Sequence, residues 1–334
     1  MKRIISLLLA LALTLSLTAC TAPAEKADGG KLQIVTTLFP YYDFARAIAQ
    51  DRADVTLLLS PGREAHSFEP TPLDAVTISE SDVFLYNGGE GEYWVESMLD
   101  AAGEHIAVAS RMMDYVDALN EEYVEGMQGA DGHDHDHEHG SHDDHDHDHE
   151  DENDSDEIEY DEHIWTSPKN AVVLCRAVCD AICRADAENA AFYRANCENY
   201  CAQLEDLDAR FAALCESAPR RLLIFADRFP MLYFCREYGL DYRAAFHGCS
   251  GDTEPSLATI KFLIDKVEDE NIPVVYTIDF GTKKVAAVVS ECTGAAIETL
   301  YSMQTVSRAD FDAGETYLTL MERNFEALRK GLNA

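Results

Sequence analysis

The sequence predicts an α/β protein of two lobes, each a roughly four-stranded parallel sheet flanked by helices, joined by one long rigid helix. Short apolar runs alternate with amphipathic stretches in two separate series, which is the pattern of β-α-β units and parallel sheets. A long stretch without Gly or Pro lies between the two series. With 334 residues and a 47% hydrophobic composition, the chain is long enough for two cores.

The first series runs from residue 32 to residue 110. Its apolar runs are bounded by turn signals such as Pro61-Gly62 and are therefore expected to be strands, at 32–38, 54–60, 82–89 and 105–110. The amphipathic stretches between them are expected to be helices, at 41–50, 71–81 and 92–103.

A helical region separates the two series. Ser167 is a plausible N-cap and Pro168 fits the first turn of a helix that runs to residue 186. The next segment, Ala187 to Ser217, predicts a helix of about 45 Å at 1.5 Å per residue. A helix of that length can bridge two lobes. We therefore expect lobes at 31–186 and 218–334, with 187–217 as the linking helix.

The second series repeats the rhythm beyond Pro219. Strands are expected at 221–227, 241–248, 273–279 and 296–304, and helices at 229–239, 254–271, 282–294 and 313–332. The two series share the same alternation of strands and helices, but their amino-acid sequences show no visible similarity.

The chain begins with features of an exported protein. Lys2 and Arg3 precede an apolar run, Ile4 to Leu17, that is too short to span a membrane comfortably. The following "LTAC" resembles a bacterial lipobox. The resemblance implies a signal peptide over 1–19, lipid on Cys20 and a tether over 20–30. An ordinary secretory peptide in which Cys20 is incidental is the alternative.

The net charge of −36 argues against nucleic acid as a partner, because phosphate would be repelled. Residues 131–162 alone carry 17 acidic and no basic residues. Within them, Gly132 to Glu152 holds eight of the twelve histidines. Neutral imidazoles beside carboxylates bind zinc weakly and exchange it quickly. We interpret the His/acid-rich loop, 131–157, as a zinc collector, with a solvated linker as the alternative.

Nine cysteines remain after Cys20, and an odd number cannot pair completely within the chain. Cys175, Cys179 and Cys183 recur every four residues, as do Cys197 and Cys201. On helices each set lines one face, where cysteine behaves as a small apolar residue. Core packing is the favoured interpretation, and a metal cluster is the alternative.

Side chains that can bind a metal follow several predicted strands. His66 follows the strand 54–60 and His163 precedes a helix, while Asp227 and Gln304 stand at strand ends of the second series. Parallel sheets bind ligands at the carboxyl ends of their strands. A cleft between the lobes could therefore bring these residues together.

Two motifs make the interpretation more specific. "GREAHSFEPTP", with His66, and "DEHIWTSP", with His163, resemble the two histidine motifs of the zinc- and manganese-uptake receptors of ABC transporters. The ending "DAGETYLTLMERNFEAL" also resembles the last helix of that family. The resemblance implies two α/β lobes linked by a rigid helix, with His66 and His163 as metal ligands. Many zinc-binding members carry a His/acid-rich loop between these motifs.

The sequence departs from the family at the other two ligands. The third ligand, a His or Glu in the family, falls near Asp227, and the fourth, usually an acid, falls on Gln304. An amide oxygen is a weak zinc ligand, so a water or His247 could take that place. Glu69 and Asp161 are candidates for orienting the histidine rings.

The expected function is a lipid-anchored, extracytoplasmic receptor of an ABC importer, not an enzyme. It would capture Zn²⁺ between the lobes as a monomer and deliver it to a membrane permease and its ATPase. Nitrogen-rich ligation favours zinc over manganese. The alternatives are a manganese receptor of the same fold, a zinc hydrolase built on His66, His163 and Asp227, and a surface adhesin or metal buffer. No H-E-x-x-H motif supports the hydrolase.

Overall fold

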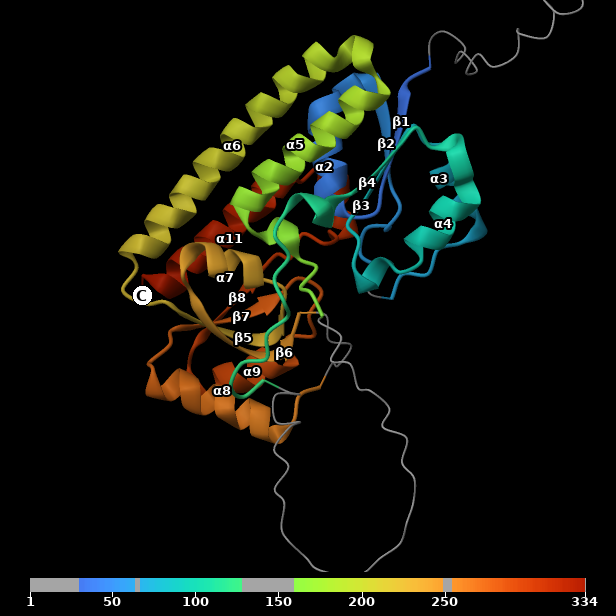
Figure 1. Ribbon diagram of the computed structural model, residues 1–334. Helices are drawn as coiled ribbons and strands as arrows, with labels where there is room; N and C mark the ends of the chain where they lie inside the picture. The colour runs from blue at the N-terminus through green and yellow to red at the C-terminus, as the bar shows by residue number, and fades with distance from the viewer. Residues whose placement is uncertain (1–29, 64–66, 128–158, 249–253, 334) are drawn as a thin grey trace, which may run out of the picture.

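The computed structural model describes residues 30–63, 67–127, 159–248 and 254–333, and these form two α/β lobes (Figure 1). The first sheet contains β1 (Leu32–Thr36), β2 (Ala53–Leu57), β3 (Val83–Tyr86) and β4 (Val108–Arg111) in the order β2-β1-β3-β4. The second contains β5 (Leu222–Phe229), β6 (Asp241–His247), β7 (Val274–Ile278) and β8 (Ala296–Leu300) in the order β6-β5-β7-β8. All pairings are parallel, which confirms the predicted fold class.

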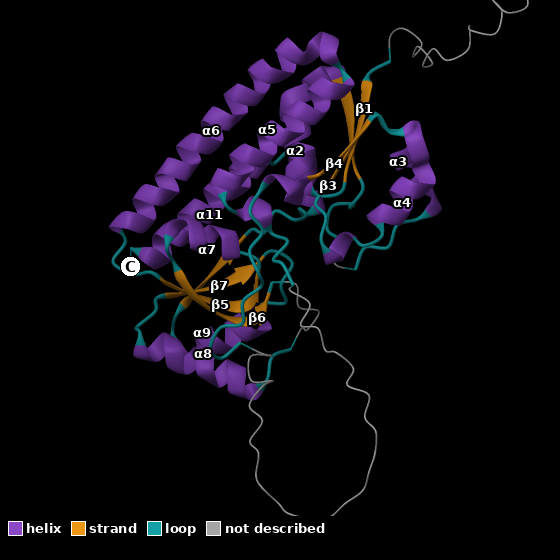
Figure 2. Ribbon diagram, in the orientation of Figure 1, coloured by secondary structure: helices purple, strands orange, loops and turns teal. Residues whose placement is uncertain are grey.

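Helices cover both faces of the first sheet. They are α2 (Phe39–Ala49), α3 (Pro72–Ser79), α4 (Val95–Ala102) and α5 (Pro168–Ala185). Figure 2 shows α3 and α4 on one side of the sheet, and α2 and α5 on the other. The predicted cap of α5 is confirmed, because the Asn170 amide donates to Ser167 Oγ at 3.4 Å. The first-lobe strands end at one edge of the sheet, as parallel pairing requires.

The long helix α6 (Ala190–Ser217) links the two sheets, as predicted. It starts slightly later than expected, because a 3-10 turn at Ala187–Asn189 precedes it. Its 28 residues correspond to about 42 Å. It packs along α5 and α2 in the first lobe and reaches α7 and α11 beside the second sheet (Figure 1).

The helices of the second lobe are α7 (Leu232–Tyr238), α8 (Leu257–Asp269), α9 (Lys284–Thr293), α10 (Arg308–Ala313) and α11 (Tyr317–Leu332). The short helix α10 was not predicted. Ser307 caps it by accepting from the Asp310 amide at 3.0 Å, and Gly314 ends it in a left-handed conformation. A single turn of this kind carries too little periodicity to be read from sequence.

Hydrogen bonds tie the lobes together in addition to α6. The buried Asp43 carboxylate of α2 accepts from the Tyr200 hydroxyl of α6 at 2.6 Å and from the Tyr317 amide of α11 at 2.9 Å. The Trp165 indole donates to the Ser302 carbonyl at 2.7 Å. These contacts fix the strand ends of the second sheet against the first lobe, so the space between the lobes has a defined shape.

The predicted signal peptide, lipidated Cys20, tether and His/acid-rich loop lie outside the described residues. Among the described helices, none is long and apolar enough to cross a membrane. The lobe boundaries at residues 186 and 218 stay predictions.

Candidate metal centre

A pocket lies where the ends of the second-lobe strands face His163 of the first lobe. Several polar side chains face it: His163, Arg228, Asp279, Ser302, Gln304 and Thr305. The remainder of its wall comes from Pro230, Gly248, Ile278 and Phe280. Segments that follow β5, β6, β7 and β8 thus all reach this pocket, which is the position that a parallel sheet offers to a ligand.

A second pocket adjoins it on the first-lobe side. Residues that follow β1, β2 and β3 line it, among them Thr37, Leu59, Asn87 and Glu92. Gln304 lines both pockets, and the adjacent residues Glu162 and His163 line one each. The two pockets therefore meet at Gln304 and at the chain around His163.

His163 is held in a fixed orientation. Its Nδ1 lies 3.1 Å from Asp161 Oδ1, which also accepts from the His163 backbone amide at 2.8 Å. The ring is buried, with its edge toward Trp165. Nδ1 is thereby assigned as the protonated nitrogen, so Nε2 is the nitrogen that a metal ion would use. The prediction that Asp161 orients this histidine is confirmed.

Charge around His163 suits a cation. Burial alone lowers the pKa of this imidazole, but the carboxylates of Asp161, Glu162 and Glu121 outweigh burial and raise it. The same negative field that stabilises an imidazolium stabilises a metal ion bound to the ring. His163 therefore combines an oriented nitrogen donor with an electrostatic environment favourable to positive charge.

Gln304 is buried between the lobes. Its backbone carbonyl accepts from the Phe39 amide at 3.3 Å, which fixes the segment after β8 against α2. The preceding Met303 has a φ of 60°, so the chain turns sharply here and directs Gln304 toward the first lobe. The structure brings Gln304 to the same pocket as His163, but its donor atom is a neutral amide oxygen.

Asp227 stands at an irregularity of β5, where the register with β6 shifts between Phe225 and Arg228. A Cβ placed at Gly281 would lie 1.9 Å from Asp227 Oδ2, so this carboxylate packs closely on the loop after β7. The residue of β5 that lines the pocket is Arg228. Asp227 as a metal ligand stays a prediction.

His247, like His163, has a carboxylate partner at Nδ1, but its ring does not line the pocket. Its Nδ1 lies 2.6 Å from Glu121 Oε2, and its ring packs on Tyr123 with centroids 5.0 Å apart. The pocket lining includes the next residue, Gly248, and not His247. His247 thus contributes to the wall around His163 through its neighbour rather than through its imidazole.

Asp279 was not singled out from the sequence. It follows β7 directly and lines the pocket with His163 and Gln304. Its Oδ1 accepts from the Ser302 amide at 2.7 Å, which holds the carboxylate at the pocket wall. Position at the end of a parallel strand was the available signal, since the same rule had selected Asp227 and Gln304.

Two buried carboxyls back the first-lobe pocket. Glu162 Oε1 accepts from the Gly91 amide at 2.8 Å, and Gly89, at a φ of +92°, gives the backbone room to pass close to it. Glu92 Oε2 accepts from the Gly88 amide at 2.8 Å. Burial raises the pKa of Glu92 to about 7. The first-lobe pocket therefore contains two carboxyl groups, of which Glu92 can hold a proton near pH 7.

His66 lies outside the described residues. The two ends of its loop do not: Leu59 and Phe68 both line the first-lobe pocket. Within the described residues, the pocket between the lobes offers one imidazole, one carboxylate and one amide. This nitrogen and oxygen set suits Zn²⁺, although the described carboxylates and imidazoles are not gathered within 4.8 Å as a closed site would be.

Two similar α/β lobes, a rigid connecting helix and a polar pocket between the lobes define a two-lobed receptor for a small solute. The sequence matches the family described as "Zinc-uptake complex component A periplasmic" over residues 34–331. The chain belongs to this zinc-uptake family, and the resemblance carried by the two histidine motifs is confirmed. The family assigns it to extracytoplasmic transport rather than to catalysis, which removes the hydrolase alternative.

Individual relatives agree with this assignment. The chain is 32% identical over 315 residues to the "High-affinity zinc uptake system protein ZnuA" of Bacillus subtilis, covering 93% of this chain and 91% of that protein. It is 29% identical over 333 residues to the "Zinc-binding lipoprotein AdcA" of Streptococcus pneumoniae. That match covers 99% of this chain but 61% of AdcA, so AdcA contains a further region.

Solved structures share the fold. The "Metal-dependent Lipoprotein YcdH" of Bacillus subtilis superposes with a TM-score of 0.72 at 28% identity, covering 91% of this chain and 100% of that one. The Zn(II)-bound ZnuA-like domain of Streptococcus pneumoniae AdcA gives a TM-score of 0.70 at 26% identity, with the same coverage.

Proposed function

We propose that this protein captures Zn²⁺ in the pocket between its lobes and delivers it to the permease of an ABC importer, which an ATPase drives. The observation that carries the proposal is His163, a buried imidazole oriented by Asp161 in a pocket shared with Asp279 and Gln304. The names of ZnuA and AdcA, and the Zn(II)-bound domain of AdcA, support zinc as the cargo.

We assign His66 and His163 as the principal ligands. Asp227 and Gln304 remain the candidates for the other two positions, and Asp279 joins them because it lines the pocket with His163. Two imidazoles favour zinc over manganese, which prefers carboxylates.

Further parts of the proposal rest on the sequence. The lipobox-like "LTAC" supports a lipid anchor at Cys20, which would hold the receptor near its permease. The His/acid-rich loop over 131–157 would supply zinc to the pocket by weak, fast binding. A monomer is expected, since each chain holds both lobes of the cleft.

The experiment is a zinc titration of the mature protein against a competing chelator of known affinity. His163→Ala removes the oriented nitrogen and should weaken the tight site at least 100-fold, because few strong ligands remain. His105→Ala, an exposed histidine of the first lobe, is the matched control and should bind like the parent. An unchanged affinity in His163→Ala would refute the proposed site.

A further inference from the structure

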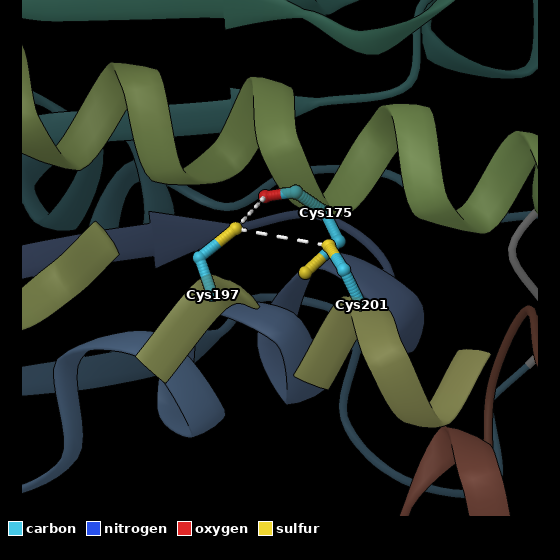
Figure 3. Close-up of side chains that lie close together, drawn as sticks. All are labelled: Cys175, Cys197 and Cys201. Carbon is cyan, nitrogen blue, oxygen red and sulfur yellow. Dashed lines mark hydrogen bonds between the residues drawn. The ribbon is translucent and has the colours of Figure 1, made fainter. Parts of the chain in front are cut away.

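A group of thiols lies in the interface between α5 and α6, away from the pocket between the lobes. The sulfurs of Cys175 on α5 and of Cys197 and Cys201 on α6 all lie within 4.8 Å of one another. Figure 3 shows the three side chains pointing toward one another between the two helices. All three are buried and unbridged.

Two more cysteines extend this group. The sulfur of Cys179, one turn after Cys175, lies 4.0 Å from that of Cys183. The C-x3-C spacing on each helix places two sulfurs on the face that meets the other helix. The three sulfurs of Cys175, Cys197 and Cys201 are the ones that converge on one point between the helices.

The spacing of these sulfurs matches metal–thiolate geometry. A zinc–sulfur bond is about 2.3 Å, which places the sulfurs of a three- or four-coordinate site about 3.8 to 4.0 Å apart. Cys197 and Cys201 Sγ are 3.8 Å apart. Cys175 needs only a small side-chain adjustment to reach the same separation, since its sulfur is already within 4.8 Å of both.

The thiols are held in place by backbone groups of the opposite helix. Cys197 donates a hydrogen bond to the Cys175 carbonyl at 3.8 Å, and Cys201 donates one to the Val172 carbonyl at 3.9 Å. An ion would replace these hydrogen bonds, and the thiols would lose their protons on binding it. Thiolate is the form that binds soft metals.

Packing alone does not require this arrangement. Any small apolar side chain would fill the same interface, whereas three sulfurs converging from two helices are what coordination needs. A disulfide within either C-x3-C pair would join consecutive turns of one helix, and one between the helices would use only two of the three sulfurs.

We propose that Cys175, Cys197 and Cys201 form a second metal site that binds one thiophilic divalent ion of the zinc and cadmium class. Binding releases the thiol protons to solvent, up to three per ion, and Arg176 offsets part of the resulting negative charge. The ion would clamp α5 to α6, the helix that links the lobes.

Cadmium is the probe, because its ultraviolet charge-transfer absorption arises from thiolate ligands and not from histidine or carboxylate. The full mature chain is unfolded in urea, refolded under anaerobic reducing conditions with Cd²⁺, and passed over a chelating resin. We expect the thiolate band to remain. Cys201→Ala should reduce that band at least twofold, whereas cadmium held between the lobes gives no such band and does not affect the comparison.

Cys215→Ala is the matched control, because Cys215 lies on the same helix and is equally buried at 1% exposure. Both substitutions remove one buried sulfur, so a difference between them reports ligation rather than packing. Circular dichroism checks that each variant is folded, and Cys197→Ala serves as a second ligand variant. The proposal is overturned if the parent shows no band, if Cys201→Ala and Cys215→Ala behave alike, or if mass spectrometry shows disulfides that persist in reductant.

Discussion

The Nδ1 atom of His163 and the Oδ1 atom of Asp161 lie 3.1 Å apart in a buried environment between the lobes. The same carboxylate oxygen accepts from the His163 amide, so ring and backbone are fixed by one group. The sharp turn at Met303 brings Gln304 to the pocket that this ring faces. The zinc-binding proposal depends on this preorganised nitrogen donor.

Asp161→Asn and Asp161→Ala should weaken zinc binding to different degrees. Asparagine keeps an oxygen that accepts from Nδ1 but loses the charge, and we expect a loss of about tenfold. Asp161→Ala removes both the oxygen and the charge, and its zinc affinity should fall about 100-fold. Chelator-competition titrations measure both values, with Asp54→Ala, an exposed acid, as the control. Equal affinities in all four proteins would show that the Asp161 contact does not support metal binding.

Gln304→Glu should tighten zinc binding about tenfold, because it places a charged oxygen where the chain now offers a neutral amide. His247→Ala should leave the affinity nearly unchanged, since its imidazole contacts Glu121 and does not line the pocket. The same titrations compare the two variants with the parent. A large loss in His247→Ala together with a silent Gln304→Glu would make His247 the fourth ligand.

Much of the fold follows from residues that are local in the sequence. Each strand is a short apolar run ended by a turn signal, and Ser167-Pro168 predicts the start of α5. The cysteine spacing on α5 and α6 correctly predicted buried faces. A local sequence pattern carries no information on distances between helices, however. The convergence of Cys175 with Cys197 and Cys201 is therefore visible only in the folded chain.

The site was predicted less completely, for the same physical reason. Gln304 lines the pocket that His163 faces, as the strand-end rule suggested for Gln304. Which residue of β5 faces that pocket depends on strand register, and at the shift between Phe225 and Arg228 it is Arg228 that lines the pocket. A bulge of this kind changes side-chain direction without leaving a reliable mark in the sequence.

Glu92→Gln should change how stability depends on pH. Burial raises the pKa of Glu92 from 4.5 to about 7, so the folded protein holds a proton that the unfolded chain releases. Its contribution to stability is complete below pH 4.5 and is lost as the pH rises through 7. Between pH 4.5 and pH 8, the free energy of unfolding of the parent should therefore fall by about 3 kcal/mol more than that of Glu92→Gln.

Urea unfolding of both zinc-free proteins at several pH values measures that difference. Glu96→Gln, an exposed position on α4, is the control and should follow the parent. Parallel curves for the parent and Glu92→Gln would show that Glu92 stays ionised in the folded state.

Deletion of residues 131–157 should remove the weak class of zinc sites and leave the tight one. The deleted loop contains eight histidines, whereas His66, His163 and Gln304 are untouched. Calorimetry of the parent and the deletion variant measures both classes. Loss of the tight site in the deletion variant would contradict the role of the loop as a collector.

The central claim is that one zinc ion binds tightly between the lobes at His163. Anomalous diffraction at the zinc absorption edge, from crystals of the mature protein grown with one equivalent of Zn²⁺, tests it most directly. The account predicts an anomalous peak in the pocket shared by His163, Asp279 and Gln304, about 2.0 to 2.1 Å from His163 Nε2, with His66 completing the contact. A protein with zinc elsewhere and no peak at His163 would contradict it.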